Sequence, residues 1–282
     1  MENSAIPPAQ LTVSIVLFNS CVKLLKNTLN SLQIAALRAV EDGLVSGVSV
    51  DLVDNSSDMA YRDSVLQILA AFQDEQGYQV RYRALENNLG FGGGNNTVNH
   101  SLNSDFHLIL NPDVELADDA ISTALSRLED DPGIVLLSPH VSSGSGSQEF
   151  LCKRYPSVLV LLVRAFAPDI VGRFFRRQLE DYEMRDLCTN DTETDVVLAS
   201  GAFMLVRTKA LLAVGGFDES YFLYFEDFDL SLRLAHFGRL VFYPATKIVH
   251  HGGYAASKGW RHMSLFIKSG FRFFNTHSWR WI

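Results

Sequence analysis

The residues best suited to chemistry lie in one acidic and aromatic stretch of the chain, Gly216 to Gly238. Its carboxylates include Asp218, Glu226, Asp227 and Asp229, and they are interspersed with phenylalanine and tyrosine. A carboxylate held against aromatic rings is poorly solvated, which raises its pKa and suits it to act as a general base. The same stretch has the spacing and the acidic first turn of a capped amphipathic helix, so the residues alone leave a catalytic and a structural interpretation open.

Two further places carry residues that could hold a metal ion. Asp113 follows the apolar run FHLIL and a turn-forming proline, where an aspartate at a strand end could hold a divalent cation against a diphosphate. A plain Asx turn before a helix is the structural alternative. His250 and His251 end a late apolar run, and neighbouring residues of a strand point to opposite faces. One of the two therefore faces the site, and the residues do not say which.

A glycine-rich loop, NNLGFGGGNN at residues 87–96, could bind phosphates through its backbone N–H groups. It lacks the Gly-Lys-Ser/Thr of a phosphate loop, and it follows the third expected strand, whereas a dinucleotide fingerprint follows the first. Asp54 ends the second expected strand and could hydrogen-bond a ribose or a base edge. A flexible connection and a turn aspartate are the structural alternatives for these two features.

The elements that must position these residues alternate between strand and helix. Strands are expected at residues 11–18, up to 54, 78–86, 106–110 and 133–138, and helices at 22–40, around 58–72, 95–102 and 120–128. This alternation predicts an α/β fold with a mostly parallel sheet that is covered by helices on both faces. Ligands of such sheets bind at the carboxyl ends of the strands, where Asp54, the glycine-rich loop and Asp113 all fall.

The pattern changes after residue 139. We expect a turn at 142–147, apolar and basic helices at 157–177, and a solvated, mobile connection at 180–195. One bent strand or two short ones should follow at 196–206, then a short helix at 209–214 and two brief strands at 240–245 and 247–253. The last helix is expected to occupy residues 259–282.

Composition limits the classes of function. The chain has 282 residues, of which 47% are hydrophobic, so it can form one large domain or two small ones with a substantial core. Its net charge of -8 argues against a general nucleic-acid binder, and an acidic chain that handles a phosphate compound usually needs a metal cation. Three separated cysteines, Cys21, Cys152 and Cys188, favour a reducing compartment without structural zinc. The first residues lack the features of a signal peptide, which predicts a cytoplasmic protein.

The last expected helix is basic and aromatic. It contains Arg261, Lys268, Arg272 and Arg280 and three tryptophans but no acidic residue. Such a helix is suited to the headgroup region of an anionic membrane. Packing on the core or at a homodimer interface is the alternative.

Taken in order, these motifs resemble those of the family 2 inverting glycosyltransferases of the GT-A fold, and within them the bacterial rhamnosyltransferases of lipopolysaccharide or O-antigen assembly. The matching segments are SIVLFN, LVDNSS, NNLGFGGGNN, LILNPDVEL, ASGAFMLVRTKALLAVGGFDESYFLYFEDFDLSLRL and IVHHGG. They extend from about Leu11 to Gly253, and their combination is specific although no single segment is. The segment WRHMSLFIKSGFRFF is also similar to the basic, aromatic end of such enzymes.

The resemblance implies a role for each candidate residue. The donor site would be formed by Phe18, Asn19, Asp54, Asn88, Gly90, Phe91, Asn95 and Asn111. The acceptor site would include Ser200, Gly201 and Glu226. Asp113, in the family's Asp-x-Asp position, would bind Mg2+ or Mn2+, and His250 would help to hold the metal diphosphate, with His251 as the alternative. Asp227 would be the catalytic base, with Glu226 as the alternative.

The implied fold is a single α/β domain of the GT-A type, with a Rossmann-like, mostly parallel central sheet flanked by helices. We expect a disordered leader at residues 1–10, a nucleotide-sugar-binding half at 11–140, an acceptor-binding and catalytic half at 141–258, and an amphipathic helix at 259–282.

The implied function is metal-dependent transfer of a sugar with inversion at the inner membrane. The donor would be dTDP-L-rhamnose and the acceptor a lipid-linked, lipopolysaccharide or O-antigen glycan. A UDP-sugar is the alternative donor. A nucleotidyltransferase would need a glycine-rich basic loop after the first strand, where the sequence has FNSCVK, and a non-catalytic sugar-nucleotide-binding module is the remaining alternative.

Overall fold

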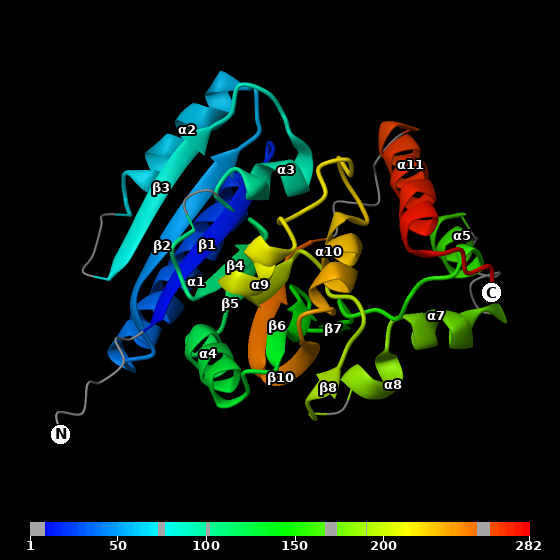
Figure 1. Cartoon of the computed structure of the whole chain (residues 1–282). Coiled ribbons are helices and arrows are strands. Elements are labelled where there is room, and N and C mark those ends of the chain that lie inside the picture. Colours follow the sequence, from blue (N-terminus) through cyan, green and yellow to red (C-terminus); the bar gives the residue numbers. More distant parts are fainter. Residues whose placement is uncertain (1–8, 73–76, 100–101, 167–173, 190, 253–259) are drawn as a thin grey trace.

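One ten-stranded sheet organises the chain in its computed structural model, which describes residues 9–72, 77–99, 102–166, 174–189, 191–252 and 260–282 (Figure 1). The first half comprises β1 (Ala9–Leu17), α1 (Val22–Glu41), β2 (Val45–Asp54), α2 (Met59–Leu69), β3 (Tyr78–Ala84), α3 (Gly90–Asn96), β4 (Phe106–Leu110), β5 (Val114–Leu116), α4 (Ala120–Asp130) and β6 (Ile134–Ser143). The second half comprises β7 (Gln148–Glu149), α5 (Val158–Phe166), α7 (Arg176–Tyr182), α8 (Arg185–Cys188), β8 (Thr194–Asp195), β9 (Phe203–Arg207), α9 (Thr208–Ala213), α10 (Glu226–Leu234), β10 (Arg239–His250) and α11 (Trp260–His277).

The strand order is β3-β2-β1-β4-β9-β6-β10-β5, with β7 beside β6 and β8 beside β10. Strands β1 to β4 pair in parallel, as the alternation predicts. The second half of the sheet is mixed, because β9 enters between β4 and β6 antiparallel to both, and β5 runs antiparallel to β10. The chain reaches β9 only after the long excursion through α5, α7 and α8, so the strand meets its neighbours from the opposite direction. The expected α/β sheet is confirmed, and its parallel pairing is confined largely to the first half.

Helices cover both faces of the sheet, and the strand residues alternate between them. On β4, Leu108 and Leu110 belong to the apolar cluster that includes α1 and α4, whereas Ile109 belongs to the cluster that includes α9 and α10. Alternation of this kind is the consequence of the two-residue repeat of a strand. The buried sheet is therefore a rigid support for the loops at its carboxyl edge.

Several segments differ from the sequence expectation. Helix α3 covers Gly90–Asn96, inside the glycine-rich loop, and not 95–102, and β1 begins at Ala9. Strand β9 begins at Phe203 and not at residue 196, and α11 ends at His277, five residues before the end of the expected helix at 259–282. The two expected late strands form one strand, β10, whose pairing with β6 shifts register between Tyr243 and Lys247. The expected mobile connection at 180–195 is wrong for its described residues, which form the end of α7, α8 and β8 and bury Tyr182, Met184 and Cys188. Of the expected leader, residues 1–8 lie outside the described residues.

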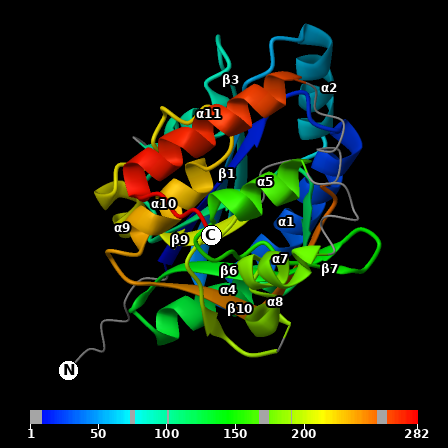
Figure 2. The ribbon, with the colours of Figure 1, turned by 90° about the vertical axis from the view of Figure 1, so that its right-hand side faces the viewer.

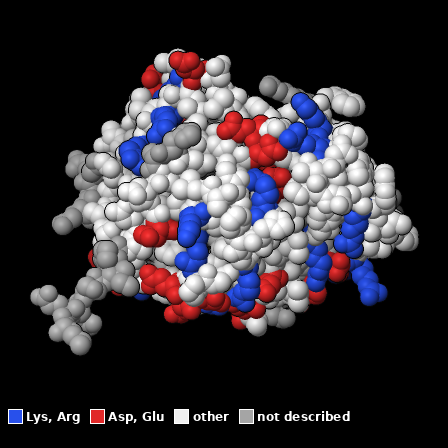
Figure 3. Space-filling view, in the orientation of Figure 1, with Lys and Arg blue, Asp and Glu red and all other residues white. Residues whose placement is uncertain are grey.

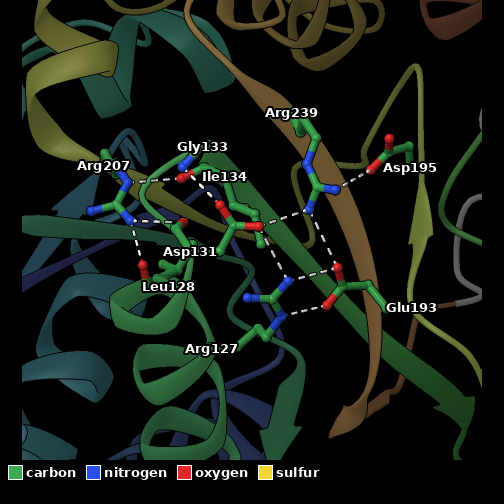
Figure 4. A network of polar contacts seen from close by, with 9 residues as sticks. All are labelled: Arg127, Leu128, Asp131, Gly133, Ile134, Glu193, Asp195, Arg207 and Arg239. Atoms are coloured by element: carbon green, nitrogen blue, oxygen red, sulfur yellow. Dashed lines mark hydrogen bonds and ion pairs between the residues drawn. The ribbon is translucent and has the colours of Figure 1, made fainter.

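An ion-pair network fastens β8 to the sheet (Figure 4). Arg127 of α4 donates to both oxygens of Glu193, at 2.5 and 2.9 Å, and Arg239 of β10 bridges Glu193, Asp131 and Asp195. The acidic side chains of this segment, which favoured a solvated connection in the sequence, are therefore paired with arginines of α4 and β10. Figure 3 shows acidic and basic side chains interspersed along the lower edge of this face, where the network lies.

Helix α11 packs across α10 with α5 beside it (Figure 2). Phe273 and Phe274 are buried in an apolar cluster with residues of α5 and with Tyr221 and Phe225. The core-packing interpretation of this helix therefore holds for one face, while Ile267 and other large apolar side chains remain exposed. Among the helices that are described, none is long and apolar enough to cross a membrane.

Candidate active site

The Glu226–Asp227 pair opens helix α10 after a tight left-handed turn. Tyr224 and Phe225 have positive φ angles of 71° and 67°, a conformation that non-glycine residues adopt only when their surroundings impose it. Here the surroundings include α11. Ser269 donates to the carbonyl of Leu223 at 2.8 Å, and the ring of Phe225 packs on Phe273. Helix α11 therefore helps to fix the direction in which the two carboxyl groups point.

Asp227 is held by backbone groups. Its Oδ2 accepts from the N–H of Gly201 at 3.0 Å, and its Oδ1 accepts from the N–H of Phe228 at 2.9 Å. Burial raises the pKa of this carboxyl above its usual range, and the two backbone hydrogen bonds oppose that rise. A side chain at Gly201 would meet the ring of Phe91 at 2.8 Å, so a glycine here lets the donor loop approach the carboxylate.

Glu226 has a different environment. It is buried, and its Oε2 has no hydrogen-bond partner among the described residues. Burial first, and the charge of Asp227 second, raise the pKa of Glu226 well above its usual value. Two neighbouring carboxyl groups cannot both ionise cheaply in such a place, and only Asp227 has two backbone N–H groups that stabilise its charged form. This arrangement favours Asp227 as the group that accepts a proton.

A cavity of about 330 Å³ opens beside this pair. It is lined by Phe150, Leu151, Lys153, Leu161, Arg164, Tyr182, Ser200, Tyr224, Phe225, Glu226, Asp227, Phe228 and Phe266. Ser200 therefore lies on the cavity wall, as the acceptor assignment requires. Gly201 meets the pair through its backbone N–H. Aromatic walls and a few convergent polar groups are typical of a site for a sugar.

Asp113 and His250 lie together at the carboxyl edge of the sheet. Asp113 follows β4, and His250 ends β10, which places its Nε2 3.6 Å from Asp113 Oδ1. The other ring nitrogen of His250 lies 2.9 Å from Glu149 Oε2. His251 points elsewhere and pairs with Glu115 at 2.9 Å. Of the two histidines, His250 is the one that the structure brings to Asp113.

The residues present suit a divalent cation that is shared with a substrate. No group of three or more His, Cys, Asp or Glu side chains among the described residues could hold a metal ion on its own. However, Asp113 Oδ1 is buried without a hydrogen-bond partner, which fits an atom that is kept for a ligand. Mg2+ is commonly bound by one or two protein groups together with substrate phosphates. Glu149, by accepting from Nδ1–H of His250, would leave Nε2 free to coordinate.

Four of the predicted donor residues, Phe18, Asn88, Gly90 and Phe91, line a second cavity, of about 220 Å³. It is lined by Val16, Phe18, Ser20, Asn55, Asn88, Gly90, Phe91, Phe222, Leu223, His262 and Leu265. Gly90 has a φ angle of +78°, and a side chain there would meet the carbonyl oxygen of Phe222 at 2.1 Å. Only glycine lets the loop pass this close to the segment that precedes α10.

Other predicted donor residues lie next to this cavity and support it. Asp54 is buried and accepts from the N–H of Ser56 at 2.8 Å and from the hydroxyl of Tyr82 at 2.6 Å. Asn95 is buried beneath the loop, where it accepts from Ser14 and donates to the carbonyl of Phe91. Asn95 thus holds the loop and does not line the cavity.

The two remaining donor candidates, Asn19 and Asn111, make hydrogen bonds through their backbone N–H groups. Asn19 follows β1 with a φ angle of 48°, and its N–H donates to Ser56 Oγ at 2.9 Å. Asn111 joins β4 to the second half of the sheet through its N–H, which donates to the carbonyl of Ala202 at 3.0 Å. Their side chains are not among those that line either cavity.

Several residues of the site were not found from sequence. Asn55 accepts from the N–H of Leu89 and donates to the carbonyl of Gly90, so it anchors the glycine-rich loop, and its position beside Asp54 was the available signal. Glu149, Lys153 and Arg164 come from segments whose sequence shows no motif. Only the fold brings them to the site.

The three parts of the site, a cleft beside a glycine-rich loop, an Asp–His pair and a carboxylate pair, stand at one edge of a GT-A sheet. Such an arrangement is what the resemblance to the GT-A glycosyltransferases implies. Residues 12–212 match the family described as Glycosyl transferase family 2, and the chain belongs to that family.

Two relatives are similar to part of the chain. The chain is 31% identical over 180 residues to the N-acetylglucosaminyl-diphospho-decaprenol L-rhamnosyltransferase of Mycobacterium tuberculosis (strain CDC 1551 / Oshkosh), covering 63% of this chain and 57% of the relative. It is 28% identical over 171 residues to the rhamnosyltransferase WbbL of Escherichia coli (strain K12), covering 57% of this chain and 61% of the relative. The matches thus span less than two thirds of each relative.

Solved structures share the fold at low identity. GalNAc-T7 with UDP, GalNAc and Mn2+ aligns with a TM-score of 0.64 and 15% identity, covering 98% of this chain and 48% of the other. The mannosyltransferase PcManGT of Pyrobaculum calidifontis with GDP-Man and Mn2+ aligns with a TM-score of 0.61 and 15% identity, covering 95% and 67%. The predicted GT-A fold and glycosyltransferase class are therefore confirmed.

Proposed function

We propose that this glycosyltransferase moves L-rhamnose from dTDP-L-rhamnose to a hydroxyl of a lipid-linked, lipopolysaccharide or O-antigen glycan at the cytoplasmic face of the inner membrane. The observation that carries the proposal is the meeting of three groups at one sheet edge: the donor cleft, the Asp113–His250 pair and the Glu226–Asp227 pair. Both curated relatives described above are named as rhamnosyltransferases, which supports L-rhamnose as the sugar.

The geometry supports a direct displacement. An acceptor hydroxyl in the cavity beside Asp227 would give its proton to that carboxylate as its oxygen bonds to the anomeric carbon of the donor. The bond from that carbon to the nucleoside diphosphate breaks at the same time, and the diphosphate leaves with its electron pair. Attack from the face opposite the leaving group inverts the anomeric centre. Burial raises the pKa of Glu226, and in its protonated form this side chain can donate a hydrogen bond to the incoming sugar.

We also propose a divalent cation, Mg2+ or Mn2+, held by Asp113 and His250 together with the donor. When bound, such an ion stabilises the negative charge that develops on the departing diphosphate. The orphaned Oδ1 of Asp113 and the carboxylate behind His250 support this assignment. The solved structures with Mn2+ share this fold.

The alternatives are weaker on specific grounds. A module that only binds sugar nucleotides has no use for a buried carboxyl pair with raised pKa values, because such groups destabilise the folded state. A nucleotidyltransferase conflicts with the family that the chain belongs to. A UDP-sugar donor remains an outcome of the test that follows.

The donor is tested with a panel of sugar nucleotides. The protein is incubated with each of dTDP-L-rhamnose, UDP-N-acetylglucosamine, UDP-galactose and GDP-mannose, with Mn2+ and a glycan acceptor, and released nucleoside diphosphate is measured. We expect acceptor-dependent release with dTDP-L-rhamnose at least about tenfold faster than with the others, a discrimination of about 1.4 kcal/mol. Fastest turnover of a UDP-sugar would replace the proposed donor.

We propose that α11 attaches the enzyme to an anionic membrane. Its large apolar side chains Trp260, Ile267 and Phe271 are 89%, 56% and 59% exposed. Lys268 is exposed on the same helix, and Arg272 is exposed there but pairs with Asp218 at 2.9 Å. Apolar and basic groups together favour the headgroup region of anionic lipids. Sedimentation with phosphatidylglycerol vesicles should be lost for Ile267→Ser/Phe271→Ser. Equal sedimentation of that variant would contradict the attachment.

A further inference from the structure

Two cations share one aromatic ring on the wall of the cavity beside Asp227. Lys153 Nζ lies 5.6 Å from the centre of the Tyr182 ring, and Arg164 Cζ lies 5.9 Å from it. All three residues line the cavity. Lys153 is only 6% exposed, which is unusual for a lysine. Burying a cation is costly unless it is paired, so this position calls for an explanation.

The carboxylates near these two cations are Glu183 and, on the same cavity wall, Glu226 and Asp227. Lys153 donates to the carbonyl of Phe150 and lies 3.6 Å from Glu183 Oε1, but Glu183 is also held by Arg185 at 2.6 Å. Among the described residues, no carboxylate lies within ion-pair distance of Arg164. Burial first, and the charge of Arg164 second, lower the pKa of Lys153 to about 8, so the lysine is still mostly protonated at neutral pH.

An apolar groove of about 170 Å³ lies next to the cavity, between α5 and α11. The groove is lined by Val158, Leu161, Leu162, Phe225, Phe266, Ile267, Gly270, Phe271, Phe274 and Trp279. Leu161, Phe225 and Phe266 line both the groove and the cavity. The groove therefore adjoins the cavity that holds the two cations and the carboxylate pair.

We propose that Lys153 and Arg164 form an anion subsite that binds a phosphate of the acceptor, and that the groove between α5 and α11 binds the hydrocarbon chain attached to that phosphate. The acceptor is then a sugar linked through phosphate to a lipid, with its hydroxyl at Asp227. The choice of acceptor rests on the proposed transfer reaction. The two cations at the Tyr182 ring and the apolar groove next to them are the observations that favour this occupant. Paired charge-assisted hydrogen bonds of this kind are the strong ones in proteins.

Binding without turnover tests the subsite. Isothermal titration of the full chain in EDTA, which removes divalent metal, uses three probes: farnesyl diphosphate, farnesol and inorganic diphosphate. We expect the wild type to bind farnesyl diphosphate at least about tenfold more tightly than either of the others. Farnesol lacks the diphosphate that would contact the two cations, and inorganic diphosphate lacks the hydrocarbon chain that would contact the groove. In Arg164→Met and Lys153→Met, the preference over farnesol should fall below about threefold.

Controls separate the subsite from misfolding and from the reaction. Lys209→Met changes an exposed lysine outside the cavity and should keep the full preference. Arg164 is exposed, so Arg164→Met gives a folded variant even if the buried Lys153 does not tolerate change. An unchanged preference in Arg164→Met, or a wild type that binds farnesol and farnesyl diphosphate equally, overturns the subsite. Equal binding of inorganic and farnesyl diphosphate overturns the groove. Failure of transfer with every sugar nucleotide would instead overturn the proposed function and leave these binding results standing.

Discussion

Asp227→Asn is expected to lower acceptor-dependent sugar transfer by about 10²–10⁴-fold, the usual contribution of a general base. Asparagine keeps the size of the side chain and, through its one amide oxygen, can still accept from one of the two N–H groups, that of Gly201 or that of Phe228, but it cannot take up the acceptor proton. The donor cleft is a separate cavity, so the affinity for the nucleotide should stay within a fewfold. Released nucleoside diphosphate measures transfer, and titration with the nucleotide measures binding.

Glu226→Gln is the matched comparison for this change. If Glu226 carries a proton in the wild type, glutamine preserves its charge and nearly its shape, and transfer should stay within about tenfold of normal, as expected for the loss of one ordinary hydrogen bond. The reverse order, with Asp227→Asn nearly active and Glu226→Gln inactive, would assign the base to Glu226. Near-normal turnover of both variants would remove the carboxylate pair from the chemistry.

Asp113→Ala is expected to weaken Mn2+-dependent donor binding by at least about 10–100-fold, because losing a metal ligand should cost no less than losing a residue that supports one. The change removes the orphaned buried oxygen and leaves Nε2 of His250 without the carboxylate that lies 3.6 Å from it. Donor affinity is measured by titration with and without Mn2+, and the ratio of the two affinities is the readout.

Asp118→Ala serves as the control for this measurement, since Asp118 is an exposed aspartate that follows β5 in the same segment. It should leave the Mn2+ dependence unchanged. Glu149→Gln should have an intermediate effect, because the amide can still bond the ring of His250 without stabilising a charge there. A full Mn2+ dependence in Asp113→Ala would show that the cation is held elsewhere.

Much of the first half of the molecule follows from local sequence patterns. Apolar runs separated by amphipathic helices are enough to place β1 to β4, and a parallel sheet then brings Asp54, the glycine-rich loop and Asp113 to one edge. The Glu226–Asp227 pair was visible as an acidic helix start among aromatic residues. These patterns involve residues that are close together in the chain, and they can therefore be recognised in the sequence alone.

The rest depends on contacts between distant parts of the chain. The antiparallel entry of β9 and the order of the second half of the sheet depend on where the chain returns after residue 202. The acidic segment around Glu193 looked mobile because its cation partners, Arg127 and Arg239, are far away in sequence. Lys153 likewise reaches the cavity from a segment with no regular element except one bridge, to Leu198.

The choice between His250 and His251 shows how one structural fact sharpens a sequence hypothesis. Adjacent strand residues point in opposite directions, so only one could face Asp113. Pairing of β10 with β5 directs His251 toward Glu115 and turns His250 toward Asp113 and Glu149. The role of His250 as a metal ligand stays a prediction, and the position of its ring beside Asp113 supports that prediction.

The most direct measurement of the central claim is the anomeric configuration of the sugar in the product. The protein is incubated with dTDP-L-rhamnose, Mn2+ and a lipid-linked acceptor, and the product is analysed by NMR through the one-bond carbon–hydrogen coupling at the anomeric carbon. A single displacement assisted by Asp227 predicts a rhamnosyl linkage whose configuration is opposite to that of the donor, formed only when acceptor is present. A linkage with retained configuration, or rhamnose recovered only as the free sugar, would contradict it.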